Sequence, residues 1–281
     1  MFLTKLDESR MSRPIVRKIY CYALGLLLPF TSIDANPWEL GFRYGQGFRV
    51  PGRFDSNLNG FSSSFDPTVL SDVTVSGGKG TATYEALLRY SIDSESKISF
   101  VLGRQDLSTL TINELTTDRF ATQLKNDIFS YHLLVMYHFV YRLPRGMEWE
   151  NGLGLGFVSA DWQIRGYSGG GNSSTSLFNQ RGNLRGSGLG YRLETAINLP
   201  LVDNNYFQIG IGYHHIAIPN FSGNYNGETS SFYLGSEGRV GVFDNTRVLD
   251  ANVSTDQFLR RLDLSSGSWN LYFSVLHRFL D

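Results

Sequence analysis

The sequence has 281 residues, with 25 basic and 26 acidic side chains and a formal net charge of −1. No basic field is available to attract nucleic acid, so we expect no nucleic-acid partner. The only cysteine, Cys21, lies among the first 35 residues. The rest of the chain therefore supports neither disulfides, nor thiolate chemistry, nor cysteine metal ligands.

Residues 1–35 are typical of an export signal. Three basic residues precede an apolar run over 19–28, and Ala35 offers a small residue for cleavage. The run is shorter than the ~20 residues that a helix needs to span a bilayer. Two acidic residues stand before Met11, where a signal should be basic, so Met11 makes the better natural start. We expect a cleaved signal peptide over 1–35 and a mature domain over 36–281.

Eight segments of the mature chain alternate apolar and polar residues with period two, which predicts β-strands with one apolar and one polar face. In chain order they are 38–49, 81–92, a third that begins at Ile98, 128–142, 148–157, 189–199, 207–214 and 268–279. From Phe129 to Tyr141 every odd-numbered residue is aromatic or aliphatic. A tilted strand crosses a bilayer in about 9–11 residues, and its lipid face must be apolar throughout.

The links between these segments alternate in length. Short links fall at 93–97, 143–146 and 200–205, and long polar links at 50–80, 104–127, 165–183 and 219–257. This asymmetry is typical of outer-membrane barrels, with turns in the periplasm and loops outside. Aromatic residues gather beside the short turns and predict a girdle at the inner interface: Trp38, Tyr90, Phe100, Tyr141, Trp149, Phe207 and Phe279.

The sequence therefore predicts an all-β fold, an eight-stranded antiparallel up-and-down transmembrane β-barrel with short periplasmic turns and long extracellular loops. It resembles small bacterial outer-membrane barrels of the OmpA-transmembrane and OmpW kinds, which implies export to the outer membrane. The alternative is a secreted β-sandwich or lipocalin-like barrel, in which the apolar face would line an interior core. Within the longest link, residues 230–242 have the composition to extend strands above the membrane or to form another hairpin, and we favour strand extension over a dedicated receptor site.

The polar faces of the predicted strands carry charges of both signs that would meet in the lumen. They are Glu39, Arg43, Arg49, Glu85, Arg89, Glu148, Glu150, Arg192, Glu194 and Arg278. An eight-stranded barrel is just wide enough for side chains to fill, and unpaired charges there would cost several kcal/mol each. We expect a polar plug of paired charges. A narrow ion path or small-ligand cavity is the alternative, which the many inward glycines favour.

No metal or cofactor is expected from the histidines. His214 and His215 are neighbours on a strand, so their side chains point to opposite faces. His132 and His138 share the lumen face but lie about 20 Å apart along the strand. Neither pair has the spacing of a metal site.

The stretch Tyr213-His-His-Ile-Ala-Ile-Pro-Asn220 resembles the corresponding strand of the outer-membrane lipid A 3-O-deacylases. The resemblance implies that His215 is the base and Glu228 the acid of a Ser–His–acid hydrolase. Its nucleophile position is occupied by Ala217, which has no hydroxyl to form an acyl-enzyme, and its asparagine position by Ile218. A hydrolase would then need another nucleophile, such as Ser222 or Ser231.

These features together predict a non-enzymatic integral outer-membrane protein that serves envelope structure and surface interactions. Its expected partners are outer-membrane lipids and lipopolysaccharide, together with an extracellular ligand held by the loops, and we expect a monomer. Two alternatives stay open, an outer-leaflet lipid A acyl hydrolase and a narrow channel for small solutes.

Overall fold

The computed structural model describes residues 38–50, 74–77, 80–115, 120–170, 175–202, 204–219, 221–225, 227–235, 240–244, 258–261 and 265–279. All of them belong to one of the two units into which the chain divides, residues 37–279. The expected signal peptide over 1–35 lies outside the described residues. None of the helices among the described residues has the length and apolarity needed to cross a membrane.

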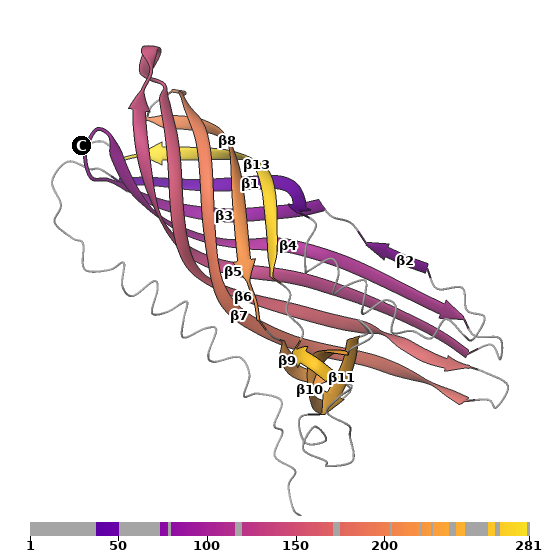
Figure 1. Ribbon diagram of the computed structural model, residues 1–281. Helices are drawn as coiled ribbons and strands as arrows, with labels where there is room; N and C mark the ends of the chain where they lie inside the picture. Colours follow the sequence, from indigo (N-terminus) through magenta and orange to yellow (C-terminus); the bar gives the residue numbers. More distant parts are fainter. Residues whose placement is uncertain are drawn as a thin grey trace, which may run out of the picture. The chain divides into compact units, whose positions relative to one another are not determined.

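Eight strands form a closed antiparallel barrel (Figure 1), as the sequence predicts. They are β1 (Trp38–Val50), β3 (Gly80–Ser91), β4 (Ser96–Leu115), β5 (Phe120–Arg142), β6 (Glu148–Gly170), β7 (Thr175–Pro200), β8 (Asn205–Ala217) and β13 (Ser266–Arg278). From β3 to β8 each strand pairs with the next of these strands along the chain. The ring closes because β13 pairs with both β1 and β8, while β1 pairs with β3. The topology is therefore up-and-down.

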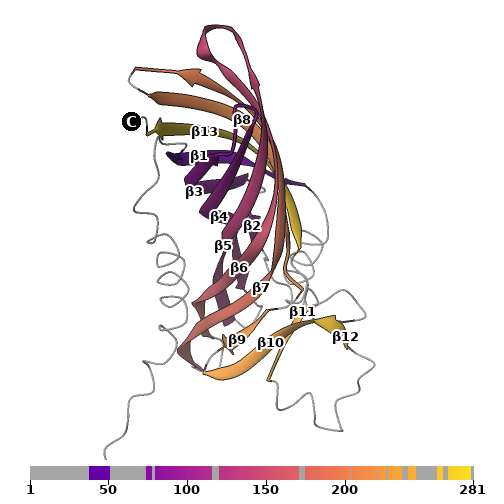
Figure 2. The same cartoon turned by 90° about the vertical axis from the view of Figure 1, so that its left-hand side faces the viewer.

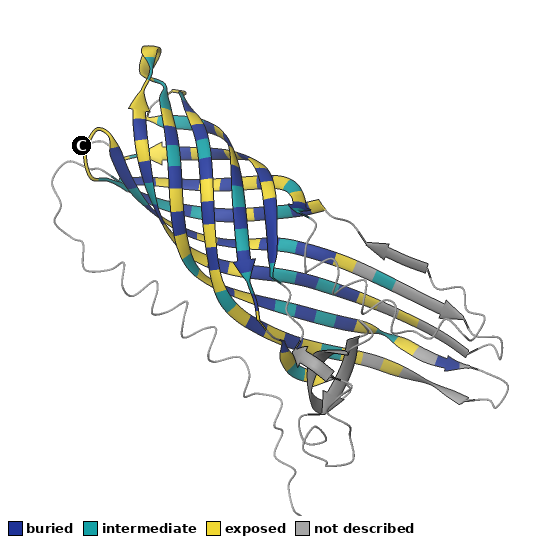
Figure 3. Cartoon of the chain, in the orientation of Figure 1, coloured by how far each residue is buried: buried dark blue, intermediate teal, exposed yellow. Residues whose placement is uncertain are grey.

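Buried and exposed residues alternate along every barrel strand (Figure 3), and the two sets are reversed relative to a soluble protein. On β1 the charged Glu39 and Arg43 are buried, whereas Phe42 and Phe48 are 68% and 58% exposed. On β6 Leu155 is 69% exposed while Glu150 is buried. A water-soluble sandwich or lipocalin-like barrel would bury its apolar face, so that alternative is wrong.

The predicted short turns join β3 to β4, β5 to β6 and β7 to β8. Asp93 caps the first of them, because its Oδ1 accepts the backbone N–H of Glu95 at 2.8 Å. That hydrogen bond favours the carboxylate and lowers the pKa of Asp93. The second turn is a 3₁₀ turn over Pro144–Gly146 in which Arg145 has a φ of 63°. Asn204 has a φ of 61° in the third, a conformation that asparagine tolerates better than most residues.

Two of the predicted long loops are wrong. Strands β4 to β7 contain 20, 23, 23 and 26 residues, so β-structure fills most of 104–127 and 165–183. A bilayer needs only about 9–11 residues per strand, and the surplus forms an extended sheet beyond the closed barrel (Figure 1). β2 (Thr74–Gly77) pairs with β4 in this region. Apart from β2, the predicted loop 50–80 lies almost wholly outside the described residues.

The segment after β8 also forms strands. β9 (Ser222–Tyr225) pairs with β7 and with β10 (Glu228–Gly235), and β10 pairs with β11 (Val240–Asp244) and β12 (Phe258–Arg261). These strands lie together at the far end of β7 (Figure 2). Residues 230–242 include the β10–β11 hairpin, which is one of the two structures that their composition predicts.

Candidate functional site

The lumen holds two groups of interacting charges at different heights. The turn-side cluster lies near the short turns and comprises Glu39, Arg89, Lys97, Glu148, Glu150 and Arg278. The mid-barrel cluster lies further along the strands and comprises Arg43, Glu85, Arg192 and Glu194. Nine of the ten charged residues that the sequence predicts in the lumen belong to one of these two clusters. Arg49 is also buried, and its guanidinium donates to the backbone carbonyl of Leu107.

Lys97 lies at the centre of the turn-side cluster. Its Nζ is 3.1 Å from Glu39, 2.7 Å from Glu148 and 2.9 Å from Glu150. Arg278 bridges Glu39 and Glu148 at 2.6 and 2.9 Å. Each carboxylate thus faces at least two cations, which is the arrangement that a buried charge requires.

Arg89 is the third cation of the turn-side cluster, and two side-chain amides lie beside the cluster. Arg89 pairs with Glu39 at 3.2 Å and with Glu150. The side-chain amides of Asn198 and Gln208 donate to Glu150 at 2.7 and 3.1 Å. These bonds satisfy acceptors of Glu150 that lie out of reach of bulk water.

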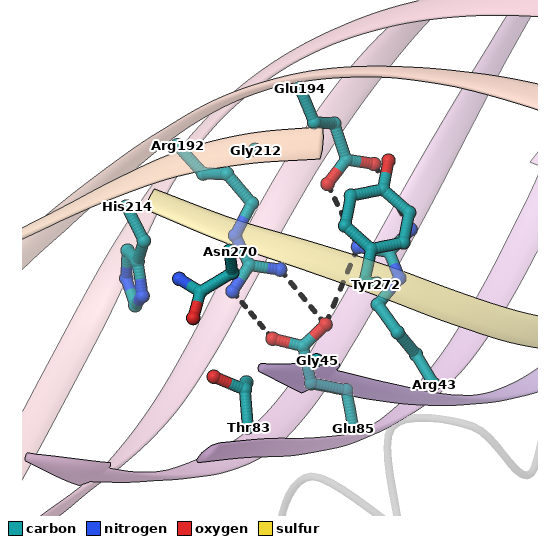
Figure 4. A pocket seen from close by; sticks show the side chains of 10 residues that line it. All are labelled: Arg43, Gly45, Thr83, Glu85, Arg192, Glu194, Gly212, His214, Asn270 and Tyr272. Atoms are coloured by element: carbon teal, nitrogen blue, oxygen red, sulfur yellow. Dashed lines mark hydrogen bonds and ion pairs between the residues drawn. The ribbon is translucent and has the colours of Figure 1, made fainter. Parts of the chain in front are cut away.

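Two bidentate pairs form the mid-barrel cluster (Figure 4). Arg43 donates to both carboxylate oxygens of Glu194, at 2.8 and 3.1 Å. Arg192 donates to both oxygens of Glu85, at 2.9 and 2.5 Å. Arg43 also lies 3.4 Å from Glu85 and joins the two pairs. Its guanidinium stacks over the Tyr272 ring, 3.9 Å from the centroid, so its flat face is covered as well.

Each cluster is electrically balanced when its Arg, Lys and Glu residues are counted. Three cations face three carboxylates in the turn-side cluster, and two face two in the mid-barrel cluster. An ion path normally carries charges of one predominant sign that attract the permeating ion. The paired residues instead give each cluster a net charge of zero, which is the arrangement of a plug.

The cavity within the mid-barrel cluster is small. Its volume is about 10 Å³, and Gly45 and Gly212 are among its lining residues. Such a space holds about one water molecule. Thr83 Oγ1, His214 Nε2 and Tyr272 Oη line the same cavity or its wall, and no described side chain bonds to them. The geometry fits one bridging water, which is too little for a solute path.

Part of the lumen is apolar. Leu87, Val101, Leu134, Met136 and Leu276 form a fully buried cluster contributed by β3, β4, β5 and β13. Its side chains lie on the inward faces of these strands. The lumen is therefore occupied by both polar and apolar side chains.

The loop end of the barrel is covered by large apolar residues. Trp162 on β6 and Phe221, between β8 and β9, are buried and meet edge to face with ring centroids 6.1 Å apart. The Trp162 indole donates to Asn126 Oδ1 at 2.9 Å. Ile128, Ile164 and Leu184 are buried on the same inward face. Sequence analysis missed this apolar cover because it assigned much of the surrounding chain to loops.

Lys97 is the charged lumen residue that sequence analysis missed. The segment 93–97 was assigned to a turn, yet Lys97 has the same parity as Ser99, Val101 and Gly103, the polar or small face of β4. The signal was present in that parity. Extending the third strand backward by one residue would have placed Lys97 in the lumen.

The histidines lie as the strand parity predicts. His132 and His214 are buried in the lumen with ring centroids 5.0 Å apart, and His132 Nε2 is 2.8 Å from Glu85. His138 lies separately, bonded to Ser99 at 2.7 Å. Among the described residues no group of three His, Cys, Asp or Glu side chains has metal-binding geometry.

His215 faces outward and stacks on Tyr191 of β7, with ring centroids 4.9 Å apart and 25° between the rings. Its direct partner on β13 is Gly267. Just before β13, the hydroxyl of Ser265 accepts the backbone N–H of Ile218 at 3.2 Å, so that hydroxyl serves a backbone bond. Ser222 is exposed on β9. The side chains of Glu228 and Ser231 lie outside the described set, and the described contacts do not assemble a catalytic triad.

Aromatic residues encircle the barrel at two heights. One band, beside the turns, is the girdle that the sequence predicts, and it includes the Tyr141–Trp149 and Trp38–Tyr90 contacts. A second band, which sequence analysis did not identify, contains Tyr44, Tyr84, Tyr131, Tyr191, Tyr213, His215 and Trp269. We call it the outer girdle.

The distance between the girdles matches a bilayer. Tyr131 and Tyr141 on β5 are ten residues apart, and so are Trp269 on β13 and Phe279 directly after it. Ten steps of ~3.3 Å cover about 33 Å along a strand, or about 25 Å of height at a tilt of ~40°. An apolar band about 25 Å tall between two aromatic girdles is the exterior of a transmembrane barrel.

The fold and exterior thus define the class of this protein, a small transmembrane β-barrel of the outer-membrane type. No family model and no curated protein matches the sequence significantly. Among solved structures, the chain is similar to the outer membrane protein OprG from Pseudomonas aeruginosa, with 10% identity, a TM-score of 0.37, and 88% of this chain and 98% of that chain covered. It is also similar to the outer membrane protease OmpT from Escherichia coli, with 7% identity, a TM-score of 0.27, and 89% and 99% covered. Both similarities are too low to inform function, and the class rests on the closed sheet and its exterior.

Proposed function

We propose that this protein is a non-enzymatic integral protein of the bacterial outer membrane that anchors an extended sheet at the cell surface and does not conduct solutes. It is exported by a signal peptide over 1–35, and its short turns face the periplasm. The single observation that carries this proposal is the mid-barrel cluster, whose two bidentate pairs lie across the lumen around a cavity of about 10 Å³. The extended part of β4 to β7 is then the element available for function.

The geometry of this extension supports a surface role. Long strands on a rigid barrel hold their side chains in fixed positions, as a binding surface requires. A hollow of about 600 Å³ lies on this sheet, over β6, β7 and β9. The barrel provides the membrane anchor, and the proposed activity is the contact of this surface with envelope or extracellular partners.

Conductance in planar bilayers tests the proposal. The full-length protein should insert and give no resolvable current steps with small ions. A variant with both mid-barrel arginines shortened, Arg43→Ala/Arg192→Ala, serves as the comparison because it removes side chains from the plug. Current steps from the unmodified protein would overturn the proposal. Failure to insert at all would overturn the membrane assignment itself.

A further inference from the structure

The turn between β5 and β6 projects further from the barrel than the other short turns (Figures 1 and 2). The backbone carbonyl of Glu95, in the β3–β4 turn, accepts the N–H of Val140 at 2.7 Å, so that turn lies level with Val140. β5 continues beyond this level to Arg142, and the 3₁₀ turn Pro144–Gly146 follows. The exposed acids of the β3–β4 turn, Asp93 and Glu95, therefore lie below the tip.

Arg145, at the centre of this tip, has a backbone conformation that suits other residues better. Its φ of 63° lies in the left-handed region, which glycine and asparagine adopt most readily. The β7–β8 turn meets the same requirement with Asn204, at a φ of 61°. Residues held in this region cost backbone energy and are concentrated at functional sites. The backbone does not select an arginine here, so its side chain is the feature to explain.

The guanidinium of Arg145 is available to a ligand. Arg145 is exposed, and it forms no ion pair within the part of the chain that the structure describes. The turn, Leu143-Pro-Arg-Gly-Met147, contains no acidic residue. Glu148 follows it, but that carboxylate is already paired with Lys97 and Arg278, at 2.7 and 2.9 Å. The tip therefore carries a positive charge that no neighbouring carboxylate neutralises.

The height of the tip corresponds to the lipid headgroups. Tyr141 and Trp149, at the base of the hairpin, belong to the girdle beside the turns and are 52% and 44% exposed. Two strand steps separate Tyr141 from Leu143, which is about 7 Å along the tilted strand. The headgroup layer on each side of the hydrocarbon core is about 5–7 Å thick. Arg145 therefore lies at the level of the lipid phosphates.

The neighbouring β7–β8 turn adds an aliphatic surface. Leu201 and Val202 are 56% and 73% exposed. The N–H of Leu201 donates to the carbonyl of Asn205 at 2.8 Å, which fixes the turn. A Cβ added to Gly146 would lie 3.7 Å from Pro200 Cγ, so the two turns are adjacent. Aliphatic side chains beside a guanidinium suit the boundary between acyl chains and phosphates.

We propose that Arg145 binds the phosphate of an anionic phospholipid in the periplasmic leaflet, while Leu201 and Val202 contact the acyl chains of that lipid. This proposal rests on the membrane placement and orientation proposed above, and it names the lipid class that the turn end prefers. A guanidinium binds phosphate oxygens through two parallel hydrogen bonds. A zwitterionic lipid offers the same phosphate together with its own cation, so the net attraction favours the anionic lipid.

The test uses the full chain in detergent with equimolar phosphatidylglycerol and phosphatidylcholine that carry the same acyl chains. Native mass spectrometry counts the lipids that stay bound, and phosphatidylglycerol should exceed phosphatidylcholine about fivefold. Arg145→Asn should abolish this preference without lowering the urea midpoint, because asparagine tolerates the φ of 63°. Arg145→Lys should retain part of the preference.

Arg142→Asn is the matched control. It removes the same charge from the same hairpin, but Arg142 shares the parity of the buried residues of β5, so its side chain lies on the lumen side. This variant should keep the preference. Leu201→Ser/Val202→Ser should reduce the bound amounts of both lipids alike.

Any of four outcomes would overturn the proposal. They are equal binding of the two lipids by the unmodified protein, a preference that persists in Arg145→Asn, an equal loss in Arg142→Asn, and displacement of the bound lipid by millimolar glycerol phosphate. A lower urea midpoint for Arg145→Asn would also contradict it, because the arginine would then have a structural role. Failure of the unmodified protein to enter vesicles is a separate result, which would contradict the membrane placement rather than the lipid site.

Discussion

Arg192 on β7 and Glu85 on β3 meet across the full width of the lumen, with Arg192 Nη1 2.9 Å from Glu85 Oε2. Three strands separate β3 from β7 in either direction around the ring, so the pair joins opposite walls. Because both groups are buried, removing one leaves the other charge without its bidentate partner. The pair therefore acts as a cross-brace of the barrel.

Arg192→Leu should lower the free energy of unfolding by about 3–5 kcal/mol, because Glu85 is left as a buried carboxylate without its main partner. The measurement is urea unfolding in lipid vesicles. Glu85→Leu/Arg192→Leu should lose less than the sum of the two single changes. The control Arg185→Leu, at a half-exposed ion pair, should lose less than about 1 kcal/mol. Equal losses of unfolding free energy in Arg192→Leu and Arg185→Leu would show that the buried cross-brace stabilises the barrel no more than an exposed ion pair does.

Lys97→Met should destabilise the barrel by about 3–5 kcal/mol, because three buried or half-buried glutamates lose their shared cation. Lys125→Met is the matched control, since Lys125 is exposed and its ion pair is with a single carboxylate, that of Asp127, at 3.4 Å. Unfolding of the two variants is compared in the same vesicles. A Lys97→Met protein as stable as Lys125→Met would refute the balanced turn-side cluster.

Gly103→Ala should destabilise by about 1–3 kcal/mol, because an added Cβ would lie 2.5 Å from His132 Nε2 and 2.6 Å from Glu85 Cγ. The added methyl group would separate His132 Nε2 from the Glu85 carboxylate and weaken their hydrogen bond. Gly80→Ala provides the control, as the nearest atom to its added Cβ is 3.9 Å away. Thermal or urea unfolding that ranks Gly80→Ala as the more harmful change would contradict the close packing of the lumen.

An arginine in the apolar band should have an effect that depends on depth. Val135 lies between the girdles and Ser159 is opposite Tyr131 of the outer girdle, both on the exterior. Val135→Arg should lower the free energy of unfolding by about 2–4 kcal/mol, and Ser159→Arg by about 0–1 kcal/mol. Both changes in the free energy of unfolding are measured by urea unfolding in vesicles. Equal effects would indicate that water, not lipid, surrounds both positions.

His215→Phe should preserve folding and membrane insertion, because a ring at this position can still stack on Tyr191 in the outer girdle. Mass spectrometry of lipid A from cells that express the protein should show no loss of an acyl chain, with or without the change. Acyl release by the unmodified protein that disappears in His215→Phe would revive the hydrolase alternative.

Parity along the chain was enough to predict the eight strands and the face on which Arg43 or Phe42 lies, because a strand repeats every two residues. It also located the three short turns. Parity does not give the height of a side chain in the lumen. The pairing of Arg43 with Glu194 and of Arg192 with Glu85 therefore requires the register of the eight strands. That register includes the closing pair of β1 with β13, whose residues lie more than 200 positions apart.

The errors arose where the composition became polar. Polar residues from Gln105 to Asn126 suggested a loop, yet the region also contains β-branched residues that pair well in water-exposed strands. Outside the membrane both faces of a strand can be polar, so the period-two signal fades while the strand continues. The apolar cover around Trp162 lies in this extended part of the sheet, and for that reason it was not predicted.

The contact of the exterior with lipid is tested most directly by nitroxide labels on single cysteines in a Cys21→Ser background, reconstituted in vesicles. Labels at Val135 and Phe139 should collide with oxygen, which dissolves in the bilayer, and avoid a water-soluble nickel chelate. A label at Gln163, beyond the outer girdle, should collide with the nickel chelate. Nickel collisions at Val135 and Phe139 equal to those at Gln163 would contradict the transmembrane barrel.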